Sequence, residues 1–353
     1  MKLLFLGKLE PLSEFPREIC RAWARVLGPF SFVAFSNLVS ESGGSEDAAI
    51  NKIAAQMKEF QPDILVLWNA VAITETGSRS LRKICDASGV KFHFISYDDP
   101  FFLIVKPHRG YVGAHRVFTN CLASTQKYKG EGLEAEWLLP ACSYDAHIVP
   151  SKAPDKIVSA ICFFISNFYN AEVFQSPEVR AFDRLKAMRA ILEKHSVHLY
   201  SWHTLKVPEE LKSNPRFISY GFLRYDDFHS KTQYKVHFNS TVTPGYPQTN
   251  QRLFEILGIG GVQVHQHHPL LEKFFTGLFG DLAAANSPIL LYKDMKELLE
   301  KVDLLMLESD AQTQRRQFTA RLLRYLWTYD RFVMALAGLD VSPMAKFQKA
   351  NSV

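Results

Sequence analysis

The sequence contains few cysteines, and their spacing excludes a disulfide-built protein. There is no CxxC pair and no compact cysteine framework of the kind found in small secreted domains. We therefore expect buried free thiols in a reducing compartment, which places the protein in the cytoplasm. The five cysteines are Cys20, Cys85, Cys121, Cys142 and Cys162.

Long apolar runs are also missing. No stretch approaches the roughly 18 apolar residues that indicate a membrane span, so we expect none. The apolar run at the N-terminus is too short for a signal peptide, and no small-residue cleavage site follows it. Residues 2–6 are instead expected to form a first strand that ends at Gly7.

Charge of one sign is not concentrated anywhere in the chain. The net charge is +5 with a pI of about 8.8, and no long block of Lys or Arg occurs. This mild excess suits anionic substrates but does not by itself indicate nucleic-acid binding. The content of 47% hydrophobic and 22% charged residues is typical of soluble globular proteins. A GxGxxG motif, a P-loop and internal repeats are absent.

Alternating strand and helix patterns predict an α/β protein with parallel, doubly wound sheets. At 353 residues the chain exceeds a typical single core, and the polar, Pro-rich segment 150–155 is the candidate linker. We expect an N-terminal domain over 1–150 and a second domain over 151–320. Helical spacing over 311–336 predicts a long C-terminal helix, which places 321–353 apart from the second domain.

The segment 248–264 predicts a short helix between two breaks. Thr249 or Asn250 can cap its start, and apolar residues follow at helical spacing. Gly258 and the pair Gly260-Gly261 end the helix before a buried strand over 261–264. The start of a helix attracts phosphate because its backbone N–H groups are unpaired and its dipole is positive there.

Two charged residues follow this helix start. Arg252 would add a cation for a phosphate, whereas the carboxylate of Glu255 better suits the hydroxyls of a ribose or sugar. The combination indicates a phosphorylated, hydroxyl-rich ligand such as a nucleotide sugar. The alternative is an ordinary αβ unit with a solvated Glu.

Asp98 and Asp99 follow the predicted strand 91–97, where the sheet's carboxyl end would face a ligand. Two adjacent carboxylates can produce a general base, or bind a metal or sugar hydroxyls. The alternative is a turn, since Asp-Asp-Pro is also good turn chemistry.

His265, His267 and His268 follow the strand 261–264. They could be transition-metal ligands, but no further ligand motif accompanies them. Contact with phosphate or sugar, an acid–base role and a plain surface loop all remain open.

Several motifs, taken in order, resemble the CgeB-like glycosyltransferases, a family with the GT-B fold. The resemblance covers about residues 90–335, and it depends on the order and spacing of the motifs. The motifs are Ser96-Tyr97-Asp98-Asp99-Pro100, Leu138-Leu139-Pro140-Ala141, the strand 163–169, Lys235-Val236-His237-Phe238-Asn239-Ser240, Arg252-Leu253-Phe254-Glu255 and Trp327-Thr328-Tyr329-Asp330-Arg331.

The chain also departs from the family pattern. The Asp after Leu-Pro-x-Ala comes later than usual, at Asp145, and Trp327 stands in place of a His. Many GT-B enzymes with a related helix carry a second Glu at the position of Pro247. In this chain, the sugar group of a nucleotide sugar would therefore be bound by other residues than in those enzymes.

The resemblance implies two Rossmann-like domains facing across a cleft, with the C-terminal helix crossing back to the first. The second domain would bind a nucleotide diphosphate sugar, with no metal or other cofactor. Donor-binding candidates are Lys235, Asn239, Thr249, Asn250, Arg252, Glu255 and His265. Asp98 and Asp99 would be catalytic, orienting or deprotonating the acceptor hydroxyl. Acceptor-side candidates are Gly7, Tyr97, Lys106 and Arg109.

The acceptor stays open at this point. Related phage enzymes modify DNA bases, so a hydroxylated base in DNA is one candidate, and a glycan, a protein or a small molecule are others. A non-catalytic spore-coat or surface-assembly protein with the same fold is the competing class. A sugar epimerase of GT-B type would need a different set of carboxylates. The sequence does not indicate the oligomeric state.

Overall fold

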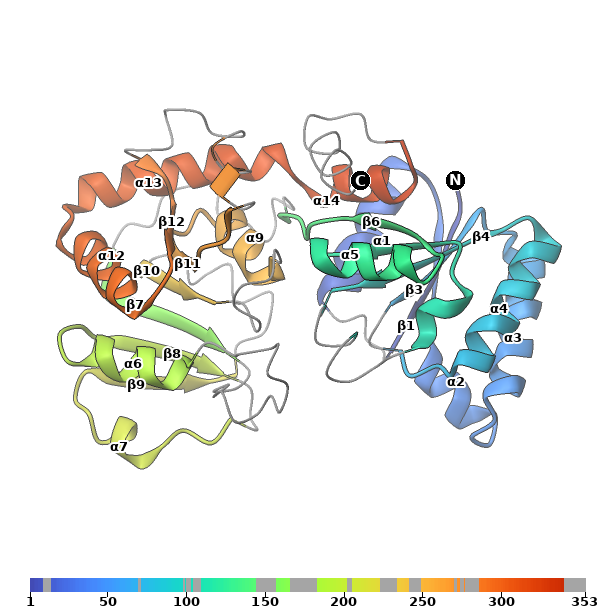
Figure 1. Cartoon of the computed structure of the whole chain (residues 1–353), viewed down its shortest axis with the longest axis horizontal. Helices are drawn as coiled ribbons and strands as arrows, with labels where there is room; N and C mark the ends of the chain where they lie inside the picture. Colours follow the sequence, from blue (N-terminus) through green and yellow to red (C-terminus); the bar gives the residue numbers. More distant parts are fainter. Residues whose placement is uncertain are drawn as a thin grey trace. The chain divides into compact units, whose positions relative to one another are not determined.

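The computed structural model divides into two compact units (Figure 1). Unit 1 comprises Met1–Pro140 and Tyr329–Val353, and unit 2 comprises Ala141–Thr328. The predicted linker at 150–155 lies outside the described residues. The structure describes residues 1–8, 14–68, 71–97, 99, 103, 109–143, 157–165, 183–201, 205–222, 234–240, 249–269, 272–273, 276 and 286–339.

Unit 1 contains a parallel sheet of six strands in the order β2-β1-β3-β4-β5-β6. The strands are β1 (Leu3–Gly7), β2 (Phe30–Ala34), β3 (Ile64–Trp68), β4 (Lys91–Ser96), β5 (Arg116–Thr119) and β6 (Glu134–Trp137). The helices are α1 (Glu14–Val26), α2 (Phe35–Glu41), α3 (Glu46–Phe60), α4 (Glu75–Ser88), η2 (Arg109–Gly113), α5 (Leu122–Gly130) and α14 (Tyr329–Leu336).

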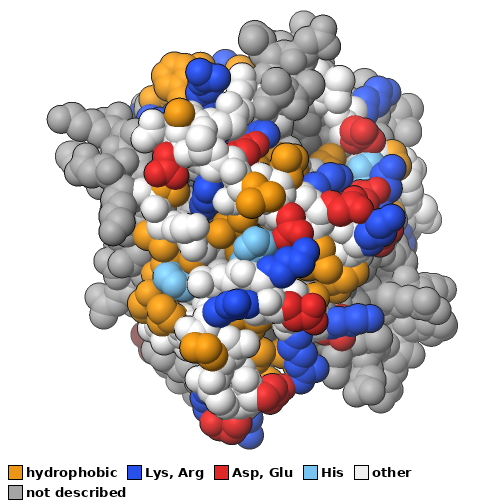
Figure 2. Space-filling model, turned by 90° about the vertical axis from the view of Figure 1, so that its left-hand side faces the viewer, with side chains coloured by type: hydrophobic (Ala, Val, Ile, Leu, Met, Phe, Trp, Pro, Cys, Tyr) orange, Lys and Arg blue, Asp and Glu red, His pale blue; other side chains and the backbone are white. Residues whose placement is uncertain are grey.

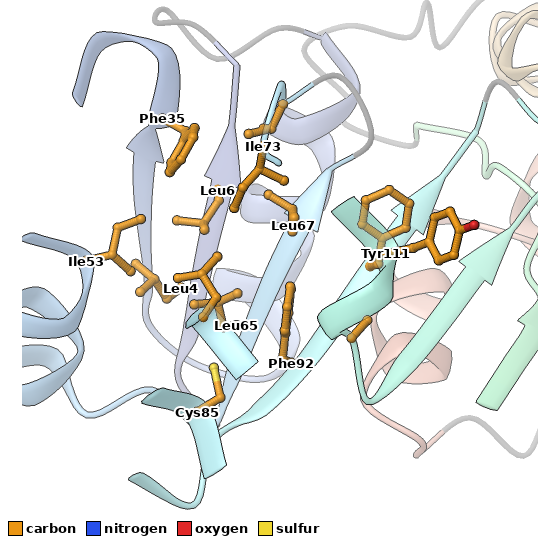
Figure 3. Close-up of a cluster of buried hydrophobic side chains, with 14 of the residues drawn as sticks. Leu4, Leu6, Phe35, Ile53, Leu65, Leu67, Ile73, Cys85, Phe92 and Tyr111 are labelled. Atoms are coloured by element: carbon orange, nitrogen blue, oxygen red, sulfur yellow. The ribbon is translucent and has the colours of Figure 1, made fainter. Parts of the chain in front are cut away.

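One hydrophobic cluster of the unit 1 core lies on one face of this sheet (Figure 3). Leu4 and Leu6 of β1 and Leu65 and Leu67 of β3 point to the same face, because side chains alternate along a strand. Ile53 of α3, like other apolar residues of α3 and α4, packs against them. Apolar residues at helical spacing therefore place α3 and α4 on this face.

Unit 2 contains a second parallel sheet of six strands in the order β12-β11-β10-β7-β8-β9. The strands are β7 (Val158–Ile165), β8 (Val197–Ser201), β9 (Phe217–Gly221), β10 (Tyr234–Asn239), β11 (Gln263–Gln266) and β12 (Ile289–Tyr292). The helices are α6 (Arg184–Leu192), α7 (Glu209–Lys212), α9 (Gln251–Gly258), α12 (Met295–Leu307), α13 (Asp310–Leu323) and η4 (Arg324–Leu326).

The two faces of strands β10 and β11 differ in polarity. Val236 and Phe238 of β10 and Val264 of β11 join the apolar core with α6 and α12. The residues that alternate with them, including Asn239 and Gln263, are polar, and they lie on the face that meets α9. The expected parallel, doubly wound α/β arrangement is confirmed in each unit.

The C-terminal helical region is not one long helix, which corrects the prediction for 311–336. Helix α13 ends at Leu323, and Trp327 has an extended backbone (φ −143°, ψ 93°). The Trp327 carbonyl accepts the N–H of Cys142 at 3.0 Å, and Thr328 forms a parallel bridge with Cys142. This pairing takes backbone groups that a continuous helix would need for its own bonds.

Helix α14, which follows this break, packs within unit 1 on α1. The ring of Phe15 contacts those of Tyr329 and Phe332 at centroid distances of 5.8 and 6.0 Å. Arg25 of α1 pairs with Asp330 of α14. Helix α14 thus belongs to unit 1, although the chain directly before it, Ala141–Thr328, forms unit 2.

Other local differences from the sequence reading are small. The sequence pattern predicts a strand over 30–35, but Phe35 begins the short helix α2. The pattern also predicts a helix over 78–88 that closes at Gly89; helix α4 ends there but begins earlier, at Glu75, capped by Thr74. Of a helix predicted over 177–195, the described part runs from Arg184 to Leu192.

The five cysteines are all buried and free, as the sequence predicts. None of the described helices is long and apolar enough to cross a membrane.

Gly113 offers a direct test of the packing in unit 1. A Cβ at this position would lie 2.1 Å from the backbone oxygen of Ser78, whose hydroxyl accepts the Gly113 N–H at 2.9 Å. We expect Gly113→Ala to lower the free energy of unfolding by roughly 1–3 kcal/mol, the usual cost of overpacking. Thermal unfolding at fixed protein concentration measures the change.

Gly130→Ala is the matched control. Gly130 ends α5, and a Cβ there would meet no atom within 4 Å. It should leave the melting temperature unchanged or raise it slightly, since Ala favours helix over Gly. Equal melting temperatures for both variants would contradict the packing argument.

Candidate ligand site at the start of helix α9

Helix α9 begins beside the carboxyl end of strand β10, and its first turn also bonds to Gln263, the first residue of β11. Asn250 is its N-cap, with an extended backbone, and its Oδ1 accepts the N–H of Leu253 at 3.0 Å. The sequence allows Thr249 or Asn250 as the cap, and the structure uses Asn250. The preceding residue, Thr249, is fully buried. The helix is thus fixed at its first turn, the place where backbone N–H groups attract anions.

Side-chain amides connect this cap to the sheet. Asn250 Nδ2 donates to Asn239 Oδ1 at 2.7 Å, and Asn239 Nδ2 donates to Asn250 Oδ1 at 3.1 Å. Asn239 Nδ2 also donates to Gln263 Oε1 at 3.1 Å, and Gln263 Nε2 donates to the Leu253 carbonyl at 2.9 Å. Three amides, from β10, β11 and the helix cap, form one continuous network.

The backbone of Ser240 extends this network from the end of β10. Its carbonyl accepts from Asn250 Nδ2 at 2.9 Å and from the guanidinium of Arg184 at 3.1 Å. Arg184 also donates to the Ser240 hydroxyl, and Tyr292 donates to the Asn239 carbonyl at 3.1 Å. A buried guanidinium from the start of α6 therefore lies at the same strand end as Asn239.

Glu255 is buried, so the alternative of a solvated Glu on this helix is wrong. Its side chain is 6% exposed, and its Oε2 lies 3.1 Å from Nη1 of Arg252, which is 34% exposed. The Arg252 guanidinium carbon lies 5.1 Å from the ring centroid of Phe164. Burial raises the pKa of the Glu255 carboxyl, and the Arg252 charge opposes that rise. Burial of a carboxylate is unfavourable because it removes the charge from water, so a carboxylate buried in this way is a candidate ligand contact.

Close packing explains the glycines that end α9. Gly260 has a φ of +77°, and a Cβ there would lie 2.8 Å from Cγ of Arg321 in α13. A Cβ at Gly261 would lie 2.8 Å from the Ile256 side chain. These residues let the chain leave the helix and enter β11 under α13, so they fix the helix rather than contact a phosphate.

Lys235 does not lie where the donor-binding prediction needs it. It stands at the amino end of β10, opposite to the Asn239 end, and its ammonium group donates to the Met306 carbonyl at 2.8 Å. A side chain at that end of a parallel strand points away from the carboxyl edge where ligands bind. The structure instead places Arg184 at the carboxyl end of β10.

His265 lies near the carboxyl end of β11 and is fully buried. Its Nδ1 lies 2.7 Å from the Gln266 carbonyl, and its Nε2 has no hydrogen-bond partner among the residues that the structure describes. Burial lowers the pKa of His265 to about 4, against the effect of the Gln266 carbonyl. At neutral pH His265 is uncharged. It can therefore accept a hydrogen bond from a hydroxyl group, but it carries no positive charge to attract a phosphate.

The other histidines of this loop differ from each other. His267 pairs with Glu272, its Nε2 2.8 Å from the carboxylate. Burial lowers the pKa of His268, with His267 adding to the effect. Among the described residues, no three His, Cys, Asp or Glu side chains are placed to hold a metal ion together.

In unit 1, Asp99 is fully buried after the end of β4. Its Oδ2 accepts from the Thr119 hydroxyl at 2.7 Å and from the Tyr128 hydroxyl at 3.0 Å. These bonds connect the carboxylate to β5 and α5, so a structural role is evident for Asp99. Asp98 and Lys106 lie outside the described residues.

The other acceptor-side candidates have local structural partners. A Cβ at Gly7 would lie 2.3 Å from the Phe32 ring, which accounts for a glycine there. Arg109 is half-exposed and pairs with Glu75 at 3.2 Å. The Tyr97 hydroxyl is buried, with no hydrogen-bond partner in the described part of the chain.

The sequence reading missed Gln263, Ser240 and Arg184. Gln263 carried a signal, because it interrupts the apolar strand Gly261-Val262-Gln263-Val264 with a residue that disfavours burial unless it is bonded. Arg184 lay within a predicted helix, and nothing in its neighbourhood distinguished it from a solvated face.

Comparison with known proteins gives one family match that spans this site. Residues 181–337, which include α9, match a family described as glycosyl transferase-like. No curated protein matches the sequence.

Solved structures resemble the whole chain despite low identity. Anabaena HepE in complex with UDP is 12% identical, with a TM-score of 0.61 over 96% of this chain and 99% of that one. The lipopolysaccharide outer core galactosyltransferase WaaB is 13% identical, with a TM-score of 0.56 over 96% and 99%. UDP-GlcNAc 2-epimerase from Neisseria meningitidis is 10% identical, with a TM-score of 0.53 over 96% and 99%. The fold is the two-domain GT-B fold.

The buried carboxyl of Glu255 predicts a pH effect on stability. Because its pKa is raised on folding, the folded protein binds this proton more tightly than the unfolded chain. Glu255 therefore reduces stability as pH rises above about 4.3, the ordinary Glu value. We expect Glu255→Gln to gain in melting temperature relative to wild type between pH 4.5 and pH 8. A constant difference across this range would show that burial does not perturb the carboxyl.

Proposed function

We propose that the protein is a glycosyltransferase that uses a nucleotide diphosphate sugar, with the start of α9 as its diphosphate site. The glycosyl transferase-like match over 181–337 and the GT-B fold support this class of enzyme. The HepE structure contains UDP, so the fold is compatible with a uridine nucleotide. Within the class, the motif order from Ser96 to Arg331 favours a CgeB-like enzyme.

The burial of Glu255 beside Arg252 is the observation that carries the proposal. An ordinary surface helix would leave both side chains in water, whereas here the carboxylate is 6% exposed. A carboxylate has about four lone-pair sites, so Glu255 can hold Arg252 and still accept from ribose hydroxyls. The backbone N–H groups of Gln251 and Arg252 would face the diphosphate, since Asn250 already caps Leu253.

The remaining donor contacts follow from position at the strand ends. Arg184 and Arg252 would supply positive charge to the leaving diphosphate, which makes a metal dispensable. Neutral His265 would accept a hydrogen bond from a hydroxyl group of the sugar or ribose. Asn239 and Thr249 are kept in the proposed site, whereas Lys235 is left out because it lies near the amino end of β10. The missing Glu at Pro247 leaves the sugar to be held by other residues.

Asp98 is the proposed catalytic group, because Asp99 is occupied by Thr119 and Tyr128. Asp98 would orient or deprotonate the acceptor hydroxyl. This division of roles between adjacent carboxylates replaces the symmetrical pair that the sequence suggests.

The acceptor is a separate proposal, and a hydroxylated DNA base is one candidate for it. The net charge of +5 is compatible with a polyanion. Figure 2 shows Lys and Arg interspersed with Asp and Glu on one face, so the described part of that face presents no continuous basic patch. Binding to DNA that weakens steeply with salt would support this acceptor, and salt-independent or undetectable binding would favour a glycan or small molecule.

Nucleotide binding tests the role of Glu255. We expect Glu255→Ala to weaken binding of the preferred member of UDP, GDP, ADP and dTDP by about 10- to 100-fold, the loss of hydrogen bonds to a charged group. Isothermal titration calorimetry measures the affinity. Glu300→Ala is the control, because Glu300 is 61% exposed on α12. Wild-type affinity in Glu255→Ala would contradict the ribose role.

The two aspartates should respond differently to substitution. Asp98→Asn should reduce kcat by at least about 100-fold, as for loss of a general base, with donor affinity unchanged. Asp99→Asn should chiefly lower the melting temperature, because two buried hydroxyls lose a charged acceptor. Steady-state kinetics and thermal unfolding of both variants give the comparison. Full turnover in Asp98→Asn would remove it from the mechanism.

A further inference from the structure

The amides of Asn239 and Asn250 have no hydrogens left for a ligand. A primary amide carries two N–H hydrogens. Those of Asn239 go to Asn250 and Gln263, and those of Asn250 go to Asn239 and the Ser240 carbonyl. Either side chain would have to break an existing bond before it could donate to a bound donor sugar.

The Oδ1 atoms of the same two residues are also engaged. Oδ1 of Asn250 accepts from the N–H of Leu253 and from Asn239, and Oδ1 of Asn239 accepts from Asn250. The pair is therefore closed on itself and on the backbone of α9. Its geometry fits a support for the helix better than a direct contact with the donor.

Gln263 completes the connection from the second strand. It is fully buried on β11, where its amide joins Asn239 to the carbonyl of Leu253 in the first turn of α9. Two separate strands thus hold the same helical turn, one through the cap and one through a carbonyl. Rotation of α9 away from either strand would leave a buried amide without a hydrogen-bond partner, and buried unpaired polar groups are rare because they are destabilising.

We infer that Asn239, Asn250 and Gln263 are positioning residues that hold the first turn of α9 in its ligand-binding orientation before any donor arrives. The inference rests on the proposed function, and it reassigns Asn239 and Asn250 from donor contacts to supports. The N–H groups of the helix start are then aimed in advance, so a diphosphate need not order them. Gln263, which is fully buried, should control donor affinity through the helix.

This role predicts a specific kinetic pattern. The helix start binds the diphosphate both before and during transfer, so loosening it removes binding that ground state and transition state share. KM for the donor should rise while kcat stays near its wild-type value. A residue that only stabilises the fold would lower the fraction of active protein, which reduces the apparent kcat and leaves KM unchanged.

Gln263→Met tests the inference, because Met keeps the length of the side chain and removes its amide. We expect the Kd of the best-binding member of UDP, GDP, ADP and dTDP to rise about tenfold, equivalent to about 1.4 kcal/mol. Amide hydrogen exchange of the peptide covering α9 should become faster, and that of α12 should not change. Calorimetry, donor kinetics and exchange mass spectrometry supply the readouts.

Gln312→Met is the matched control. Gln312 lies on α13 and donates from its own amide to Asn286 at 3.0 Å, so the same substitution removes a hydrogen bond of the same kind in the same unit. It should leave both nucleotide affinity and exchange of α9 at wild-type values. An equal loss of affinity in both variants would show a general effect on unit 2 and overturn the inference.

Asn250→Ser provides a second variant if Gln263→Met fails to fold. Ser keeps an acceptor for the Leu253 N–H but lacks the two donors to Asn239 and Ser240. Its affinity should fall below wild type, and that of Asn250→Ala should fall further. If wild-type protein binds none of the four nucleotides, the proposed function fails. If wild type binds and both Gln263→Met and Asn250→Ser bind equally well, only the positioning role is wrong.

Discussion

The need to satisfy buried amides at the junction of β10, β11 and α9 is the constraint on which the site of unit 2 depends. Asn239 and Gln263 project from the polar face of a sheet whose other face is apolar core. Their hydrogen bonds close only if α9 begins where Asn250 can meet them. The orientation of the helix start, and with it the position of the Arg252–Glu255 pair, follows from this requirement.

Local sequence signals predicted the helix but not its support. The Asn250 cap, the apolar spacing and the glycines after Leu257 are short-range features, and each has a physical meaning that can be read from neighbours in the chain. The partnership of Asn239 with Asn250 depends on parallel strand register, which no short segment determines. Burial of Glu255 has the same origin, because the sequence allows a solvated or a buried carboxylate equally well.

Long-range pairing overrides a local pattern in the C-terminal region, and tertiary structure separates residues that the sequence groups together. The helical spacing of 311–336 continues through Trp327, yet the chain breaks there because its backbone pairs with Cys142. Lys235 sits in the expected strand but at its amino end, a distinction that depends on strand direction. Asp99 resembles its neighbour Asp98 in sequence, and only tertiary contacts with Thr119 and Tyr128 separate them.

In the proposed transferase, side chains of the protein hold the donor site in its binding orientation before the donor arrives. The acceptor and the chemistry can then vary while the donor site stays the same. A crystal structure grown with UDP tests this claim most directly. The account predicts diphosphate oxygens within hydrogen-bond distance of the backbone N–H groups at Gln251 and Arg252, ribose hydroxyls at Glu255, and an unchanged amide network. A nucleotide bound elsewhere, or a first turn of α9 that rearranges to receive it, would contradict the account.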